Sequence, residues 1–252
     1  MKLTGNAVLI TGGATGIGFA MAKFLRDHDN TVIICGRRSE RLEQAATSLP
    51  GIHTICCDVA DPRQRENLFA QVAGDFPELN ILINNAGIQR DIDLTRGTVD
   101  LERGEDEIPV NFTAPIYLSA LFTPFLARKD NATIINVSSG LAFMVGHATR
   151  CPVYCATKAG IHAFSIAQRE QLSSLDISVI EVIPPMVASE LNMESRVKRN
   201  MVTSPMMMPA DDFVAQVFEQ AARGESEICL APLEGMGTHM PHGMSMPKGH
   251  QH

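Results

Sequence analysis

The sequence predicts an α/β protein built on a doubly wound parallel sheet, and two patterns along its 252 residues support this fold class. Short runs rich in Val and Ile recur as continuous apolar stretches, which is typical of parallel strands that are buried on both faces. These runs cover residues 7–11, 31–35, 53–57, 81–84, 133–137, 178–183 and 227–230. Stretches with helical periodicity separate the runs, so we expect helices on both faces of one sheet.

The ends of several helices can be placed from single residues. Asp61 and Pro62 start a helix, because an Asp side chain caps backbone amides and Pro suits the first turn. A later helix over residues 209–223 is closed by Gly224. We expect residues 1–232 to form a single domain, followed by a flexible tail at 233–252 that has no helical or strand periodicity.

Composition restricts the class of protein and of partner. Hydrophobic residues make up 45% and charged residues 19% of the chain, as in a globular protein with one full core. The formal net charge of −7 provides no positive field, which argues against nucleic acid and anionic membranes as partners. The sequence has neither an apolar run long enough to span a bilayer nor a leader before its first strand, so we expect a cytoplasmic protein. Its six cysteines are expected to be reduced.

A glycine-rich turn joins the first predicted strand to the first predicted helix. Its sequence, TGGATGIG at residues 11–18, allows a sharp turn and a close approach of the backbone to a pyrophosphate. The amides of the helix that follows would then face the anion. We interpret this turn as a Rossmann-type dinucleotide site rather than a simple tight turn. Its candidate cofactor contacts are Gly12, Thr15, Gly16, Ile17 and Gly18.

The residues after the second and third strands predict which dinucleotide is bound. An NAD-selecting protein usually has an acidic residue about 20 positions after the glycines. This chain has Arg37 and Arg38, whose guanidinium groups can bind a 2′-phosphate through charge-assisted hydrogen bonds. NADP(H) is therefore favoured over NAD(H), although the two arginines could instead be the solvated start of the next helix. Asp58 and Val59 could contact the adenine, or Asp58 could cap a turn.

A candidate catalytic pair starts the predicted helix at residues 153–175. Tyr154 and Lys158 are four positions apart, which places both on one face of a helix. An ammonium group near a phenol favours the phenolate, so we expect the pKa of Tyr154 to lie below its ordinary value of about 10. Tyr154 could then exchange a proton with a carbonyl or alcohol oxygen. Ser138 and Ser139 follow the strand at 133–137, where a hydroxyl could polarise the substrate oxygen.

Taken together, these motifs resemble those of the short-chain dehydrogenase/reductase family. The matching residues are Thr11, Gly12, Gly16 and Gly18, the run Asn84-Asn85-Ala86-Gly87, Ser139, and Tyr154 with Lys158. They stand in the family's order, and the resemblance covers residues 5 to about 230. Within the family, the run at 138–143 and the pair Pro184-Pro185 resemble a subgroup of oxidoreductases named after the operon for D-alanylation of teichoic acids.

The resemblance implies a seven-stranded sheet and a role for each motif. Tyr154 would be the acid or base, while Lys158 would lower its pKa and hold the nicotinamide ribose. Ser139 would orient the carbonyl, and Asn111 would hold a water beside the lysine for proton relay. The further cofactor contacts that the resemblance implies are Asn85, Ala86, Gly87, Tyr154, Lys158, Pro184 and Val187.

Three features depart from the family pattern. Ser139 lies two positions further from Tyr154 than is usual, so Ser138 remains an alternative for the catalytic serine. The usual Pro-Gly after the sixth strand is Pro184-Pro185 here, which stiffens the entrance to the nicotinamide pocket. The tail beyond residue 230 matches no part of the family pattern.

The substrate side is predicted to be a lid at about residues 189–208. The lid ends in Ser-Pro-Met-Met-Met at 204–208, and methionines adapt well to an apolar carbonyl compound, although they could equally pack the lid onto the core. Met and His residues in the tail could bind a soft metal such as Cu(I). No regular spacing of ligands fixes such a site, so no metal centre is predicted.

We therefore expect an NADP(H)-dependent carbonyl reductase that acts on a small-molecule carbonyl or alcohol. By resemblance it would be a homodimer or homotetramer that associates through the helices beginning near residues 100 and 153. Two alternatives remain open: an NADP(H)-binding sensor or scaffold without turnover, and an NAD-linked alcohol dehydrogenase. The presence of both Tyr154 and Lys158 argues against the sensor.

Overall fold

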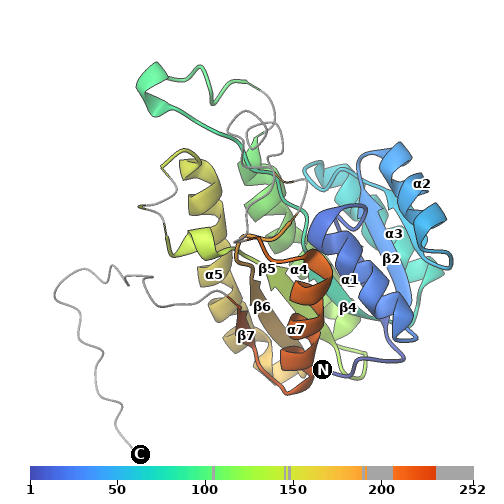
Figure 1. Ribbon diagram of the computed structural model, residues 1–252. Helices are drawn as coiled ribbons and strands as arrows, with labels where there is room; N and C mark the ends of the chain where they lie inside the picture. Colours follow the sequence, from blue (N-terminus) through green and yellow to red (C-terminus); the bar gives the residue numbers. More distant parts are fainter. Residues whose placement is uncertain (104–105, 145, 147–148, 189–190, 192–206, 231–252) are drawn as a thin grey trace, which may run out of the picture.

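The computed structural model describes residues 1–103, 106–144, 146, 149–188, 191 and 207–230. In this part of the chain, seven parallel strands form one sheet in the order β3-β2-β1-β4-β5-β6-β7 (Figure 1). The strands are β1 (Ala7–Thr11), β2 (Thr31–Gly36), β3 (His53–Cys56), β4 (Leu79–Asn84), β5 (Thr133–Val137), β6 (Ser178–Ile183) and β7 (Glu227–Cys229). The winding reverses between β1 and β4, so the predicted doubly wound parallel sheet is confirmed.

Helices cover both faces of the sheet (Figure 1). The helices α1 (Gly16–Asp27), α2 (Ser39–Ser48) and α7 (Ala210–Ala222) pack on the face that includes Val8 and Ile10 of β1. The helices α3 (Pro62–Asp75) and α4 (Ala114–Leu126) share a second core with Leu9 on the opposite face. The long helix α5 (Pro152–Leu172) lies over β5 and β6 next to α4. The sheet is therefore the middle of three layers.

The local signals for helix ends are confirmed by the hydrogen bonds. The Asp61 side chain accepts from the backbone amides of Arg63 at 2.8 Å and Gln64 at 3.3 Å, and Pro62 is the first helical residue of α3. Gly224, just beyond α7, has a φ of +90°, a conformation that favours glycine. The helix α5 ends at Leu172, and a 3₁₀ turn, η5 (Ser173–Leu175), completes the predicted stretch.

The expected helix starting near residue 100 is wrong. The short 3₁₀ turn η1 (Leu94–Arg96) ends at Gly97, whose φ of +66° is incompatible with a continuing helix. The helix that carries Asn111 starts later, at Glu107, and continues as a π-helical segment η2 (Pro109–Thr113) that runs directly into α4. Pro109 lacks an amide hydrogen, so it is suited to the start of a helix rather than to its interior.

A row of polar residues crosses the sheet on the face that packs against α4 and α5. Asn84 of β4, Asn136 of β5, Glu181 of β6 and Glu227 of β7 are register partners in adjacent strands. Asn84 donates to Asn136 at 2.9 Å and to Ser119 of α4 at 3.2 Å. Asn136 in turn donates to Ser165 and Gln168 of α5. The side-chain nitrogens of both asparagines are thus paired across the layer, whereas the Asn84 side-chain oxygen has no hydrogen-bond partner in the described residues.

Most of the predicted lid, at residues 189–208, lies outside the described residues, as does the whole tail at 233–252. Val187, just before the predicted lid, forms an isolated parallel bridge with Met208, the last residue of the predicted lid. The amide of Ala188 donates to the carbonyl of Met208, and the amide of Met208 donates to the carbonyl of Met186, both at 3.0 Å. Both ends of the predicted lid are thus joined after β6.

None of the helices in the described ranges is long and apolar enough to cross a membrane.

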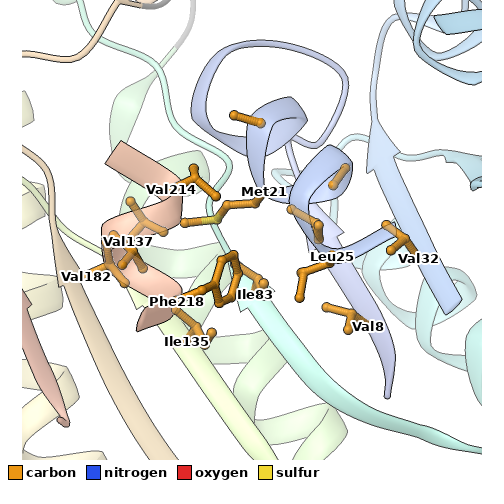
Figure 2. Close-up of a cluster of buried hydrophobic side chains, with 14 of the residues drawn as sticks. Val8, Met21, Leu25, Val32, Ile83, Ile135, Val137, Val182, Val214 and Phe218 are labelled. Atoms are coloured by element: carbon orange, nitrogen blue, oxygen red, sulfur yellow. The ribbon is translucent and has the colours of Figure 1, made fainter. Parts of the chain in front are cut away.

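A tightly packed core lies between the sheet, α1 and α7. Figure 2 shows Phe218 of α7 among apolar side chains from α1 and the central strands, including Met21, Ile83 and Ile135. Phe218 is fully buried and stacks on Phe24 of α1, with a centroid distance of 4.9 Å. Because α1 also begins at the glycine-rich turn, this core fixes the position of the turn relative to the sheet.

We expect Phe218→Ala to lower the free energy of unfolding by about 3–5 kcal/mol, because it removes a large buried ring and leaves a cavity. Leu94→Ala is a suitable control, since Leu94 is 59% exposed and its loss should change stability by less than about 0.5 kcal/mol. Denaturant unfolding followed by circular dichroism measures both values. Equal stabilities for the two variants would contradict the packing described here.

Candidate active site

The two serines after β5 differ in their contacts. Ser138 is buried, and its hydroxyl donates to the carbonyl of Val182 at 3.4 Å, back into the sheet. The Ser139 hydroxyl instead forms a hydrogen bond with the hydroxyl of Tyr154, and it also accepts from the amide of Leu141 at 3.2 Å. Of the two candidates for the catalytic serine, the structure therefore brings Ser139 and not Ser138 to the tyrosine.

Tyr154 and Lys158 lie in the first two turns of α5, and both are almost fully buried. The Lys158 ammonium lies 5.8 Å from the centroid of the Tyr154 ring. It donates a 2.8 Å hydrogen bond to the carbonyl of Val137, the last residue of β5. The predicted helical spacing thus places both groups at the carboxyl end of β5, the edge where ligands of such sheets bind.

The expected low pKa of Tyr154 is wrong for this structure. Burial raises the pKa of the phenol to about 12, although the hydrogen bond with Ser139 acts in the opposite direction. Burial also lowers the pKa of Lys158 to about 8, with partial compensation from the Glu181 carboxylate. Desolvation disfavours both the phenolate and the ammonium, and the four-residue spacing of the two side chains does not reveal it.

Asn111 holds the loop after β4 against the lysine. Its side-chain oxygen accepts from the amide of Ile88, and its side-chain nitrogen donates to the carbonyl of the same residue, both at 2.8 Å. A third hydrogen bond reaches the hydroxyl of Thr157 on α5 at 3.3 Å. A Cβ atom on Gly87 would lie 3.5 Å from the Asn111 oxygen and 3.6 Å from the Lys158 nitrogen, so these groups converge at one point.

The glycine-rich turn has the geometry of an anion cradle. Gly12 and Gly16 have φ values of +65° and +57°, which favour glycine. A Cβ atom on Gly18 would lie only 2.3 Å from the carbonyl oxygen of Gly12, so a side chain there would force the turn apart. Asn85 donates to the carbonyls of Thr11 and Gly12, and thereby fastens the turn to the loop after β4.

The first turn of α1 is suited to a pyrophosphate. Thr15 occupies the N-cap position and makes no side-chain capping hydrogen bond. The helix start, which includes Ile17, therefore lacks the usual side-chain acceptor for its amides, and an anion can take that place. The residues present thus fit the diphosphate of a dinucleotide.

The structure also shows where the predicted adenosine contacts lie. Arg37 and Arg38 are exposed and follow β2 directly, with Arg38 at the N-cap of α2. Their position is compatible both with binding of a phosphate and with the start of a helix. The Asp58 side chain accepts from the amide of Ala60 at 2.9 Å, as the turn-capping alternative predicted, and Val59 is buried.

The segment after β6 lies at the same edge of the sheet as Ser139 and the glycine-rich turn. The carbonyl of Pro184 accepts from the amide of Gly140 at 2.9 Å, which joins this segment to the turn that follows Ser139. Val187 is buried and starts the bridge to Met208. Ala86 lies over the glycine-rich turn, because a Cβ atom on Gly12 would meet its Cα at 2.9 Å. The predicted contacts therefore line the same edge of the sheet.

Sequence reasoning missed two buried polar groups beside the tyrosine. Glu107 is fully buried, and burial raises its pKa, although one carboxylate oxygen accepts from the amide of Arg90 at 3.1 Å. Cys151 accepts a hydrogen bond from the Gln89 side chain, and a hydrogen bond with Cys155 lowers its pKa to about 7. Neither residue stands in a recognisable motif, and only the helix boundary after Cys151 hinted that it would lie near Tyr154.

Comparisons with known proteins agree with this geometry. A family model described as short chain dehydrogenase matches residues 6–200. The chain is 47% identical over 236 residues to the uncharacterized oxidoreductase DltE of Bacillus subtilis (strain 168), covering 94% of this chain and 92% of that protein. This relative fits the subgroup named after the D-alanylation operon.

Solved structures share the fold. A short-chain dehydrogenase/reductase from Burkholderia phymatum, in complex with NAD, matches with a TM-score of 0.80 and 17% identity, covering 90% of this chain and 89% of that chain. A short-chain dehydrogenase from Sphingobium yanoikuyae, in complex with NADPH, matches with a TM-score of 0.76 and 26% identity, covering 88% and 87%.

The buried lysine should leave a pH-dependent signature on stability. Because the pKa of Lys158 is about 8 in the folded protein and its ordinary value is 10.5, the folded state disfavours the ammonium. The penalty is complete below pH 8 and disappears as pH rises from 8 to 10.5. Lys158→Met does not pay this penalty. Its free energy of unfolding, relative to that of the wild type, should therefore fall by roughly 3 kcal/mol between pH 8 and pH 10.5.

Denaturant unfolding at several pH values measures this difference. Lys2→Met is the control, because Lys2 is exposed and its replacement should leave a difference from the wild type that does not change with pH. A constant difference between Lys158→Met and the wild type would show that the ammonium is not desolvated.

Proposed function

The chain belongs to the short-chain dehydrogenase family of oxidoreductases, and from this premise we propose that it is an NADP(H)-dependent carbonyl reductase. It would transfer a hydride between the nicotinamide and a carbonyl or alcohol substrate. The observation that carries the proposal is the buried hydrogen bond between Ser139 and Tyr154, with the Lys158 ammonium beside the same ring. This arrangement offers a proton donor and a polarising hydroxyl to one substrate oxygen.

Proton transfer by the chain's own residues follows from their pKa values. With a pKa of about 12, the Tyr154 phenol keeps its proton near neutral pH and can donate it to a carbonyl oxygen. This protonation state favours the reductive direction. Lys158, with a pKa of about 8, can return a proton to the phenolate, because its acidity lies close to the working pH.

Ser139 and Asn111 would act by position. The Ser139 hydroxyl, already bonded to the phenol, can donate to the same carbonyl oxygen and hold it within reach of Tyr154. Asn111 would fix Ile88 and the loop before it, so that Gly87 remains beside the lysine. The water-holding role of Asn111 in proton relay stays a prediction.

A bound nicotinamide dinucleotide would supply the hydride. Its diphosphate would be held at the glycine-rich turn and at the first amides of α1, where Thr15 provides no side-chain cap. The ribose and nicotinamide would lie along Asn85, Ala86 and the lysine. Asp58 and Val59 would contact the adenine, and Pro184 with Val187 would border the nicotinamide.

The proposed preference for NADP(H) rests on Arg37 and Arg38, which follow β2 where an acidic residue would select NAD. The solved structure from Sphingobium yanoikuyae holds NADPH and the one from Burkholderia phymatum holds NAD, so the choice rests on these arginines. A small, apolar carbonyl compound bound under a lid at 189–208, association into a homodimer or homotetramer, and the cytoplasmic location stay predictions.

Replacement of the two tyrosines of the chain gives a matched test of the catalytic role. Tyr154→Phe should lower the rate of NADPH oxidation by at least about 100-fold with any ketone or aldehyde that is turned over, while the affinity for NADPH is retained. Tyr117→Phe is the control, because Tyr117 is 56% exposed on α4. A Tyr154→Phe protein with unchanged turnover would refute this mechanism. Binding of NADPH by the wild type without turnover of a broad carbonyl panel would favour the sensor.

The arginines after β2 predict a measurable cofactor preference. Arg37→Asp should weaken NADPH binding by about 10-fold to 100-fold and leave NADH binding unchanged or stronger, since charge-assisted hydrogen bonds to the 2′-phosphate are lost. Dissociation constants for both dinucleotides from fluorescence titration give the ratio. Arg63→Asp makes the same charge change at an exposed position of α3 and should preserve the ratio. Equal ratios in the two variants would count against the proposed phosphate site.

A further inference from the structure

A second group of ligating side chains lies outside the active site. His162 of α5, Glu181 of β6 and Glu227 of β7 each present one potential ligand atom, and these atoms all lie within 4.8 Å of one another. The three residues are far apart in the sequence. Their convergence depends on the register of the two strands, in which Glu181 and Glu227 are direct partners, and on α5 packing over them.

The arrangement continues the polar row that crosses the sheet from β4. At β4 and β5 the row consists of asparagines, whose amides pair with each other and with α4 and α5. At β6 and β7 it consists of carboxylates, which cannot pair with each other in the same way. Two adjacent carboxylates that can only accept are better paired by a cation than by each other.

The Glu181 carboxylate is only half satisfied. The residue is fully buried, and its Oε2 atom lies 2.8 Å from Nδ1 of His162. The Oε1 atom is buried and has no hydrogen-bond partner in the described part of the chain. A buried carboxylate oxygen without a partner is costly, and a cation bound beside it would remove that cost.

Other cations near the cluster do not satisfy this oxygen. Arg169 of α5 directs its guanidinium to the carbonyls of Val179 and Ser226, on either side of the cluster. Lys158 stands one helical turn before His162 and donates to Val137. The His162–Glu181 hydrogen bond accounts for one carboxylate oxygen of Glu181 and leaves the other without a partner in the described residues.

We propose that His162, Glu181 and Glu227 bind one divalent transition-metal ion, with Zn²⁺ as the best-suited ion. One imidazole and two carboxylates are ligands that Zn²⁺ accepts, and three protein ligands leave a fourth position for water. Ligand atoms around tetrahedral zinc lie about 3.4 Å apart. The three atoms here already lie within 4.8 Å of one another, so small side-chain movements close the site. The ion binds a deprotonated imidazole nitrogen and the two carboxylates, in place of the hydrogen bond between His162 and Glu181.

The ion can reach this site and would stabilise the edge of the sheet. The His162 side chain is 25% exposed and Glu227 is exposed, so the cluster opens to solvent on one side. The edge strand β7 has only three residues (Figure 1). The rings of His162 and Phe143 pack edge to face with a centroid distance of 4.7 Å, so the imidazole is already oriented. A bound ion ties β7 to β6 and to α5.

Zinc binding to the full chain, after treatment with a chelator, tests the proposal. Equilibrium dialysis with metal analysis gives the number of Zn²⁺ ions bound, and thermal unfolding gives the stabilisation. Zinc should raise the Tm of the wild type by about 5 °C. Glu227→Gln should bind one ion fewer than the wild type and should not show this rise. Glu225→Gln is the matched control, because it removes an exposed carboxylate two positions away. The histidines of the tail and the cysteines are present in all of these proteins, so any zinc that they bind adds equally to each ion count.

The same ion count for Glu227→Gln, Glu225→Gln and the wild type would overturn the proposal. His162→Gln provides a second variant, which should also bind one ion fewer while its circular dichroism spectrum stays like that of the wild type. Neither readout uses turnover or a dinucleotide, so the result is independent of the proposed reductase activity.

Discussion

The hydrogen bond from the Lys158 ammonium to the carbonyl of Val137 is the interaction on which the candidate active site depends. It joins the second turn of α5 to the last residue of β5, and so it fixes the helix at the edge of the sheet where parallel strands end. Tyr154, one turn earlier, is thereby held against Ser139. The burial that makes this bond strong also lowers the pKa of the lysine and raises that of the phenol, and both changes suit a proton donor near neutral pH.

A polar row under α4 and α5 distinguishes this sheet from one with two apolar faces. Asn84 and Asn136 are hydrogen-bonded to each other and to the helices above them, which specifies the positions of α4 and α5 more tightly than apolar packing alone. The carboxylates of Glu181 and Glu227 continue the same register. The proposed reductase and the proposed metal site thus share one structural element, since α5 carries Tyr154 and Lys158 at its start and His162 in the following turn.

The cofactor end depends on close approaches of the backbone. The glycine-rich turn can lie against the loop after β4 only because Gly12 and Gly18 lack side chains, and Asn85 fastens the two segments together. The packing of α1 against α7 in the core then sets the direction in which the first amides of α1 point (Figure 2). Stability of the core and the position of the proposed diphosphate site are therefore coupled.

The sequence by itself determined the strands, most helix ends, the glycine-rich turn and the pairing of Tyr154 with Lys158, because each of these depends on local periodicity or on spacing within one element. Only the tertiary structure decided that Ser139 rather than Ser138 meets the tyrosine, that the helix of Asn111 starts at Glu107 rather than near residue 100, and that the phenol has a raised pKa. It alone assembled His162, Glu181 and Glu227. Side-chain direction, desolvation and strand register arise from contacts between segments distant in the chain, and no local pattern of residues encodes them.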